Sequence, residues 1–334
     1  MPGELKITET IPVRRSDISA LRDMLILLED QGGLGYSAWL TLSLERGVLL
    51  RQDGRPASDS TFWHHLNALR TLGLAHKTDG YWDPTGAGRE IVVLGGFQDA
   101  QLSDRTRECF SQAILGSPFV RENYLVLFTG DPEADLFESG SPISYFQYQR
   151  GLYAIVTEHA DTPLELNYSQ TEGILWGMRL WCLQSGLMDE IRLPPRADVP
   201  RGRRVRLFPV RSRGHELRDP ERFTAVLRRY LGDRTPAYGE TIKADIPLLL
   251  FRLCPGERLR LSQAKRLLWS WLQERRSGAF VEAASSPAGR ASRLGANQRK
   301  SRPELGAYLE KEGTLYSVLF INKRLLEGGE ENGS

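Results

Sequence analysis

The sequence contains little cysteine and no long apolar run. Its three cysteines, Cys109, Cys182 and Cys254, are odd in number and widely spaced, which excludes a disulfide framework or a clustered zinc site. The longest clean apolar stretches, such as Ile246–Phe251 and Tyr316–Ile321, are far shorter than the roughly 18–20 residues that a bilayer requires. Met1–Arg15 lacks the apolar segment of a signal peptide. We therefore expect a soluble protein of a reducing compartment, with no membrane partner.

Motifs of common catalytic and cofactor sites are also missing. The sequence has neither a glycine-lysine loop for phosphates nor a dinucleotide fingerprint after a strand. Its five histidines form no pair with metal-ligand spacing to an acid. One acidic cluster has the composition to chelate a divalent cation, and it comprises Asp131, Glu133, Asp135 and Glu138, with His159 and Asp161 further on. Its turn-like setting favours a solvated loop, so we predict no enzyme activity, no cofactor and no small-molecule substrate, and keep a metal-dependent nuclease as the weakest alternative.

The composition is that of a globular chain, but its charge is segregated. A length of 334 residues with 40% apolar and 26% charged residues predicts two domains or three small ones. The net charge of +2 conceals an acidic stretch, Thr129–Glu172, and an arginine block, Arg196–Arg218. A second basic block, Ser285–Arg302, contains no acid. Guanidinium groups suit phosphate oxygens and base edges, so the blocks favour a polyanionic partner; the alternative is that they balance the acidic stretch or an acidic protein.

The first 95 residues predict three helices followed by a hairpin. Asp17–Gln31 has apolar residues on one stripe and ends at Gly32-Gly33, and Tyr36–Arg46 predicts a second helix. Cap-type residues at 58–60 open a third helix that continues to about Leu72. A strand at Leu74–Lys77, a Thr78-Asp79-Gly80 turn and a strand at Tyr81–Asp83 complete the pattern.

This pattern resembles the winged helix-turn-helix DNA-binding domains of prokaryotes. The resemblance is carried by Ser60-Thr-Phe-Trp-His-His-Leu-Asn-Ala-Leu-Arg-Thr-Leu-Gly-Leu-Ala-His-Lys-Thr-Asp-Gly-Tyr-Trp, which matches a recognition helix and its wing, and it covers roughly Asp17–Ile91. It implies DNA binding, although many winged helices bind protein instead.

A helix that enters a strand through glycine occurs twice more. Trp63 precedes Gly73 by ten positions and Trp176 precedes Gly186 by the same ten, while a third helix from Ser262 ends near Gly278. We therefore expect an α+β, mainly helical fold with two or three winged helix-turn-helix units and small β-hairpin wings, joined by a helical linker region. The expected divisions are a winged helix-turn-helix unit at 1–95, a helical and aromatic linker domain with an acidic loop at 96–161, a second winged-helix-like unit with an Arg-rich wing at 162–215, a helical connector at 216–245, a third winged-helix-like unit with a basic loop at 246–326, and a disordered tail at 327–334.

Candidate nucleic-acid contacts follow from these units. A 100° helical step places Phe62, Leu66, Leu69 and Leu72 on the buried side of the third helix and a polar stripe on the other side. The predicted contacts are Ser60, His64, Asn67, Arg70 and Thr71 on this helix, Arg196, Arg201, Arg203, Arg204 and Arg206 on the second wing, and Arg290, Arg293, Arg299 and Lys300 in the basic loop.

These observations predict a non-catalytic nucleic-acid-binding protein whose partner is DNA, with duplex favoured over single strand. A cytoplasmic, nucleoid-associated regulator, or a subunit of a prokaryotic replication, transposition or defence complex, fits the general use of such domains. The competing class is an interaction scaffold in which the winged helices bind partner subunits.

Overall fold

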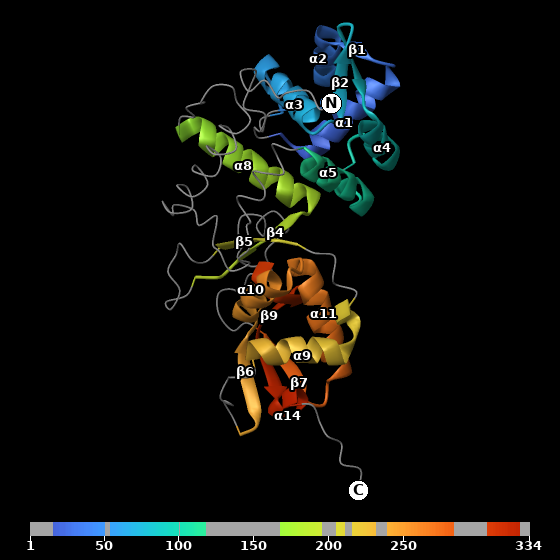
Figure 1. The fold of residues 1–334 in the computed structure, drawn as a ribbon. Coiled ribbons are helices and arrows are strands. Elements are labelled where there is room, and N and C mark those ends of the chain that lie inside the picture. Colours follow the sequence, from blue (N-terminus) through green and yellow to red (C-terminus); the bar gives the residue numbers. More distant parts are fainter. Residues whose placement is uncertain are drawn as a thin grey trace, which may run out of the picture. The chain divides into compact units, whose positions relative to one another are not determined.

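The computed structural model describes residues 16–50, 54–99, 101–117, 168–195, 205–210, 216–231, 239–283 and 306–327 (Figure 1). Of these, residues 16–117 and 168–187 belong to an N-terminal unit and residues 188–327 to a C-terminal unit. Each unit has a mixed α+β fold, with one small antiparallel sheet in the N-terminal unit and two in the C-terminal unit among the described residues.

The N-terminal unit contains the three helices and the hairpin expected from the sequence. Its elements are α1 (Ile18–Asp30), β1 (Leu34–Gly35), α2 (Tyr36–Glu45), α3 (Asp59–Thr71), β2 (Ala75–Thr78), β3 (Tyr81–Pro84), α4 (Gly86–Leu94), α5 (Asp104–Gly116) and α8 (Tyr168–Ser185). The sequence did not predict β1, which pairs with β3 to give a sheet of order β1-β3-β2. The hairpin turn uses left-handed backbone at Asp79 (φ 52°) and Gly80 (φ 89°), as a two-residue turn requires.

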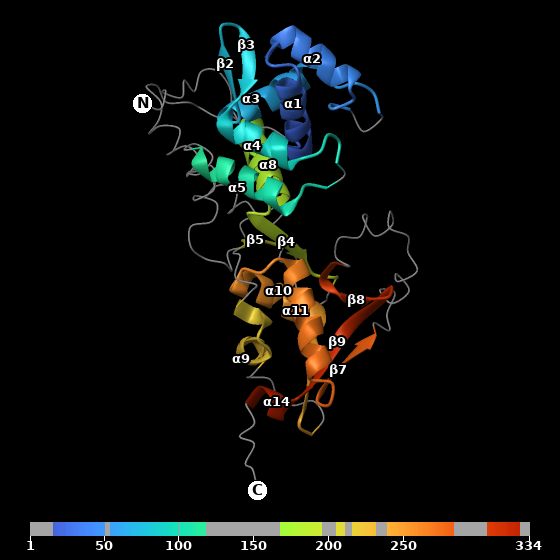
Figure 2. The ribbon, with the colours of Figure 1, turned by 90° about the vertical axis from the view of Figure 1, so that its right-hand side faces the viewer.

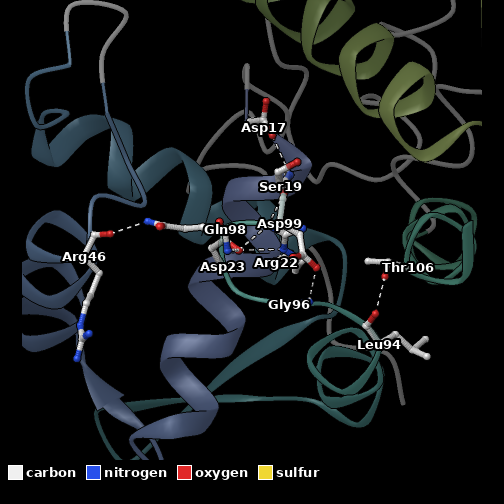
Figure 3. Close-up of polar contacts among 10 residues, drawn as sticks. All are labelled: Asp17, Ser19, Arg22, Asp23, Arg46, Leu94, Gly96, Gln98, Asp99 and Thr106. Carbon is white, nitrogen blue, oxygen red and sulfur yellow. Dashed lines mark hydrogen bonds and ion pairs between the residues drawn. The ribbon is translucent and has the colours of Figure 1, made fainter. Parts of the chain in front are cut away.

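A buried ion pair holds the segment after α4 against α1 (Figure 3). Arg22, which is 1% exposed, lies 2.8 Å from the Asp23 carboxylate and donates to the carbonyl of Asp99. Asp23 also accepts a hydrogen bond from the backbone N–H of Gln98, whose side chain donates to the carbonyl of Arg46 at the end of α2. Burial raises the pKa of Asp23, against the opposing effect of these hydrogen bonds and of Arg22. The network therefore connects α1, α2 and the α4–α5 connection.

The C-terminal unit begins with a hairpin and continues with helices that cover a larger sheet. Its elements are β4 (Met188–Arg192), β5 (Val205–Pro209), a 3-10 turn (Glu216–Arg218), α9 (Pro220–Leu231), β6 (Thr241–Asp245), α10 (Ile246–Glu257), α11 (Leu261–Glu274), β7 (Ala279–Ala283), β8 (Leu309–Lys311), β9 (Thr314–Asn322) and α14 (Lys323–Glu327). The strands β6, β9 and β7 are adjacent in that order, and β8 pairs with β9. Figure 2 shows α10, α11, β9 and β7 in one view.

The two units repeat one arrangement. In the N-terminal unit the order α1-β1-α2-α3-β2-β3 gives a sheet β1-β3-β2, and in the C-terminal unit the order α9-β6-α10-α11-β7-β8-β9 gives a sheet β6-β9-β7 in which the additional strand β8 also pairs with β9. In both cases the last strand lies between the other two. Helices α3 and α11 therefore occupy the same third position, each directly before the second strand of its sheet.

This repeat changes two of the expected divisions. Residues 216–245 are not a helical connector, because α9 and β6 supply the first helix and the first strand of the C-terminal repeat. The range 162–215 does not form one winged-helix-like unit, because α8 packs with α5 and α1 in the N-terminal unit while the β4–β5 hairpin belongs to the C-terminal unit. The expected linker domain at 96–161 is described only up to residue 117, and of the disordered tail expected at 327–334 only Glu327 is described, where it ends α14.

The β4–β5 hairpin is fastened to the N-terminus of α11. Ile191 and Phe208 of the hairpin are fully buried in the apolar core that also contains Leu268 and Trp271 of α11. The Asp189 carboxylate accepts a 2.7 Å hydrogen bond from the backbone N–H of Leu261, the first residue of α11. That N–H has no partner within its own helix, so β4 supplies the acceptor. Burial raises the pKa of Asp189.

Among the described helices, none combines the length and the apolar character needed to span a membrane.

The Asp189 contact predicts different outcomes for two substitutions. Asp189→Asn keeps an acceptor for the Leu261 N–H and removes a partly desolvated charge, so the free energy of unfolding should stay unchanged or rise at neutral pH. Asp189→Ala should lower it by about 1–3 kcal/mol, because the N–H loses its acceptor. Urea unfolding measures both, with Glu282→Ala on the exposed side of β7 as a control. Equal loss in the Asn and Ala variants would contradict the assignment.

Candidate nucleic-acid interface

Helix α3 carries the residues first expected to contact bases, and their side chains differ in solvent exposure. Ser60 and Arg70 are exposed, while His64 and Thr71 are half-buried. The prediction that Asn67 faces solvent is wrong, because its side chain is 3% exposed. Both amide atoms of Asn67 are buried without a hydrogen-bond partner among the described residues. The predicted apolar side is confirmed, since Phe62, Leu66, Leu69 and Leu72 are all buried.

The start of α3 is occupied by aromatic and acidic groups. The ring of Tyr36 packs edge-on against Trp63 at a centroid distance of 5.9 Å, and the Tyr36 hydroxyl donates to the Asp59 carboxylate. Burial, together with this carboxylate, raises the pKa of Tyr36 to about 12. Asp59 thus places a negative charge at the end of the helix where a DNA phosphate would otherwise be favoured.

Helix α11 has the more open outer side. Ala264, Leu268, Trp271 and Leu272 are buried in the core, whereas the opposite side exposes the hydrogen-bonding side chains of Ser262, Arg266, Ser270 and Gln273. Their spacing of four, four and three residues follows one side of a helix. None of these four residues was predicted as a contact from the sequence, although the spacing that marks one side of the third helix in the first unit is present here as well.

The hairpin of β8 and β9 contributes the cation Lys311 and the ring of Tyr316, both beside Trp269 of α11. The Lys311 ammonium lies 5.9 Å from the centroid of the Trp269 ring, which packs edge-on against Tyr316 at 5.5 Å. Lys311 is exposed, so its charge remains available next to the outer side of α11. Lys265 on the same helix is largely desolvated, and this lowers its pKa. Arg266 and Lys311 are thus exposed cations on this side of the described part of the unit.

Most of the predicted arginine contacts lie outside the described residues. This applies to Arg196, Arg201, Arg203 and Arg204, which fall between β4 and β5 in the sequence, and to Arg290, Arg293, Arg299 and Lys300, which fall between β7 and β8. Arg206 is part of β5, where it pairs with Ile191, and only its backbone is described. The chain thus places each basic block between two paired or neighbouring strands of the C-terminal unit.

The described residues offer little for a metal or a nucleophile. They contain no group of three or more histidine, cysteine or acidic side chains arranged to hold a metal ion. The acidic cluster from Asp131 to Glu138 lies outside them. Cys182 and Cys254 are fully buried, and burial raises the pKa of both thiols, so both pack as apolar groups.

Comparison of the chain with protein-family models, with curated proteins and with solved structures gives no match.

The burial of Asn67 predicts that it affects stability and not DNA affinity. Asn67→Leu removes two unpartnered polar atoms at similar volume, so the free energy of unfolding should rise by about 1–3 kcal/mol, and Asn67→Asp should lower it. Urea unfolding gives the stability, and fluorescence anisotropy with a labelled duplex gives the affinity. If Asn67→Leu instead destabilises the protein and also abolishes duplex binding, the prediction is contradicted and Asn67 is again a candidate DNA contact.

Proposed function

We propose that this chain is a non-catalytic DNA-binding protein with two winged helix-turn-helix units. The observation that carries the proposal is the repeated order helix, strand, helix, helix, strand, strand, which the C-terminal unit follows with one additional short strand, β8, and in which the last strand lies between the first two of each sheet. In winged helix-turn-helix domains the third helix enters the major groove and the hairpin that follows contacts the backbone or the minor groove. A second copy of the arrangement raises the number of groove contacts that one chain offers.

In this proposal the C-terminal unit makes the main contact with duplex DNA. Helix α11 presents Arg266 and Gln273, whose side chains suit guanine and adenine edges in the major groove. In the order of elements, the connection between β7 and β8 corresponds to the wing. It contains the cations Arg290, Arg293, Arg299 and Lys300. The Arg-rich connection between β4 and β5 supplies further phosphate contacts from Arg196, Arg201, Arg203 and Arg204, and β5 itself supplies Arg206.

The N-terminal unit has a smaller role in DNA contact. Ser60, His64, Arg70 and Thr71 remain candidate contacts on α3, with Asp59 opposing phosphate at the start of the helix. The Tyr36–Trp63 pair, in which the Trp63 side chain is 38% exposed, also favours a second function for this side, namely the binding of a partner subunit. This is the scaffold alternative, confined to one unit.

The biological setting follows from the general use of such domains. A cytoplasmic, nucleoid-associated regulator, or the DNA-engaging subunit of a prokaryotic replication, transposition or defence complex, is the setting that we propose. Its partners are duplex DNA and the protein subunits of that complex.

Phosphate contact predicts a steep salt dependence. The affinity of the full chain for a random-sequence duplex should fall linearly on a logarithmic plot between about 50 and 200 mM salt. Replacing both Arg203 and Arg204 by Ala should reduce the slope by about 2, since each phosphate contact contributes about 1. Anisotropy titration at several salt concentrations measures the slope. Absence of duplex binding even at low salt would favour the scaffold alternative.

Base contact by α11 predicts a loss of sequence preference on substitution of Arg266. Selection from a randomised duplex pool identifies the preferred sequence of the wild-type chain. Arg266→Ala should weaken binding to that sequence by roughly 5- to 150-fold, the equivalent of about 1–3 kcal/mol, and change random-duplex binding much less. Arg222→Ala on α9, whose side chain is 66% exposed, is the matched control. An equal loss on both duplexes would assign Arg266 to phosphate.

A further inference from the structure

The outer face of the C-terminal sheet carries a row of one cation and two aromatic rings. Lys243 of β6 and Phe280 of β7 are both direct partners of Phe320, which lies on the central strand β9. The three side chains therefore share one level of the sheet and one face. Their chain neighbours Ile242, Ala279 and Ile321 point to the other face and are buried in the core.

The three side chains form a column that runs across the strands. The rings of Phe280 and Phe320 are stacked, with centroids 4.8 Å apart and planes inclined by 14°. The Lys243 ammonium lies 5.9 Å from the centroid of the Phe320 ring. This separation of the rings equals the spacing of neighbouring strands, so the backbone itself holds them in a stack. One end of the column is closed by a cation.

The other end of the column is formed by Phe280, at the edge of the described sheet. Phe280 lies on β7, the end strand in the order β6-β9-β7, and its side chain is 60% exposed. Burial of a phenylalanine ring is worth about 1.5–3 kcal/mol, and at this position most of that stabilisation is not obtained within the chain. An aromatic face at the edge of an existing stack is shaped to receive another planar ring.

Charge favours a nucleobase over an apolar protein segment as that ring. Lys243 is exposed on the same face, about 10 Å away at two strand spacings. The chain that leaves β7 enters Ser285–Arg302, which contains five cations and no acid. Glu282, also exposed on β7, is the nearest opposing charge along that strand. Aromatic rings combined with cations are the means by which proteins bind unpaired bases, whereas an apolar partner would not require the cations.

We propose that Phe280 is a stacking site for an unpaired base of single-stranded DNA, in which the base extends the Lys243–Phe320–Phe280 column. The site is separate from α11, so it stands whether or not duplex binding is found. It adds single-strand capture, at an exposed sheet face, to the duplex contact assigned to the helix.

The test measures binding of the full chain to labelled oligothymidine, to an abasic oligomer of equal length and to a random-sequence duplex. Stacking on one base is worth about 1–3 kcal/mol, so Phe280→Ala should weaken oligothymidine binding by roughly 5- to 150-fold. Phe280→Trp should retain it, and duplex affinity should stay unchanged. The matched control is Phe97→Ala, because Phe97 is another exposed phenylalanine, 38% accessible, and lies after α4, outside the helices and hairpins assigned to nucleic acid.

The outcomes separate this proposal from the proposed function. Loss of oligothymidine binding in Phe280→Ala, with weak abasic binding in the wild type, supports base stacking even if no duplex is bound. Equal wild-type affinity for oligothymidine and the abasic oligomer overturns it. An equal loss on duplex and single strand also overturns it, because the ring would then insert between paired bases. Unchanged oligothymidine binding by Phe280→Ala, with circular dichroism like that of the wild type, overturns it as well.

Discussion

Burial of one side of α11 and one face of the β6-β9-β7 sheet in a common core is the constraint on which the C-terminal unit depends. Leu268 and Trp271 of the helix and Leu319 and Ile321 of β9 are at most 1% exposed in that core. The Trp271 indole N–H donates a 2.8 Å hydrogen bond to Thr224 of α9, which leaves this buried donor satisfied. Because helix and strand have fixed periodicities, the same burial determines which side chains point outward: Ser262, Arg266, Ser270 and Gln273 on α11, and Lys243, Phe280 and Phe320 on the sheet.

The N-terminal unit has the same order of elements but stabilises them differently. Its buried Arg22–Asp23 pair incurs a desolvation cost that the hydrogen bonds to the Asp99 carbonyl and from the Gln98 N–H offset. Gly95 lies so close to Arg22 that an added Cβ would come within 2.7 Å of the arginine side chain, so the connection after α4 tolerates no larger residue there without rearrangement. Because of this network, the connection between α4 and α5 fits against α1 and α2 in one specific way. Repetition of a topology therefore does not imply repetition of the outer surface, and the two third helices differ at the positions that a partner would meet.

Local signals in the sequence predicted the N-terminal elements well, and non-local contacts account for the failures. The helices, the Asp79-Gly80 turn and the apolar side of α3 follow from caps, glycines and periodicity within a few residues. Strand β6 was missed because its partner β9 lies more than 70 residues away, and β1 was missed because it is only two residues long. The helix-glycine-strand pattern at Gly186 is real, but it does not specify that α8 and β4 pack in different units. Asn67 shows the same limit for the candidate site, since periodicity gives the side of a helix but not what covers that side.

A helix in the third position contacts DNA only when its outer side fits the major groove without an unfavourable charge. The groove is about 12 Å wide and an α-helix with its side chains is about 10–12 Å across, so little room remains for bulky neighbours. On α3, the space beside the outer side of the helix is occupied by Trp63, Tyr36 and the Asp59 carboxylate. On α11 the outward positions 262, 266, 270 and 273 hold small or flexible polar side chains, and the Trp269–Tyr316 ring pair and Lys311 lie beside them, so the difference from α3 is a cation in place of the Asp59 carboxylate. For this reason the proposal assigns base contact to α11, which the sequence did not single out, and leaves α3 with the contacts that shape and charge still permit.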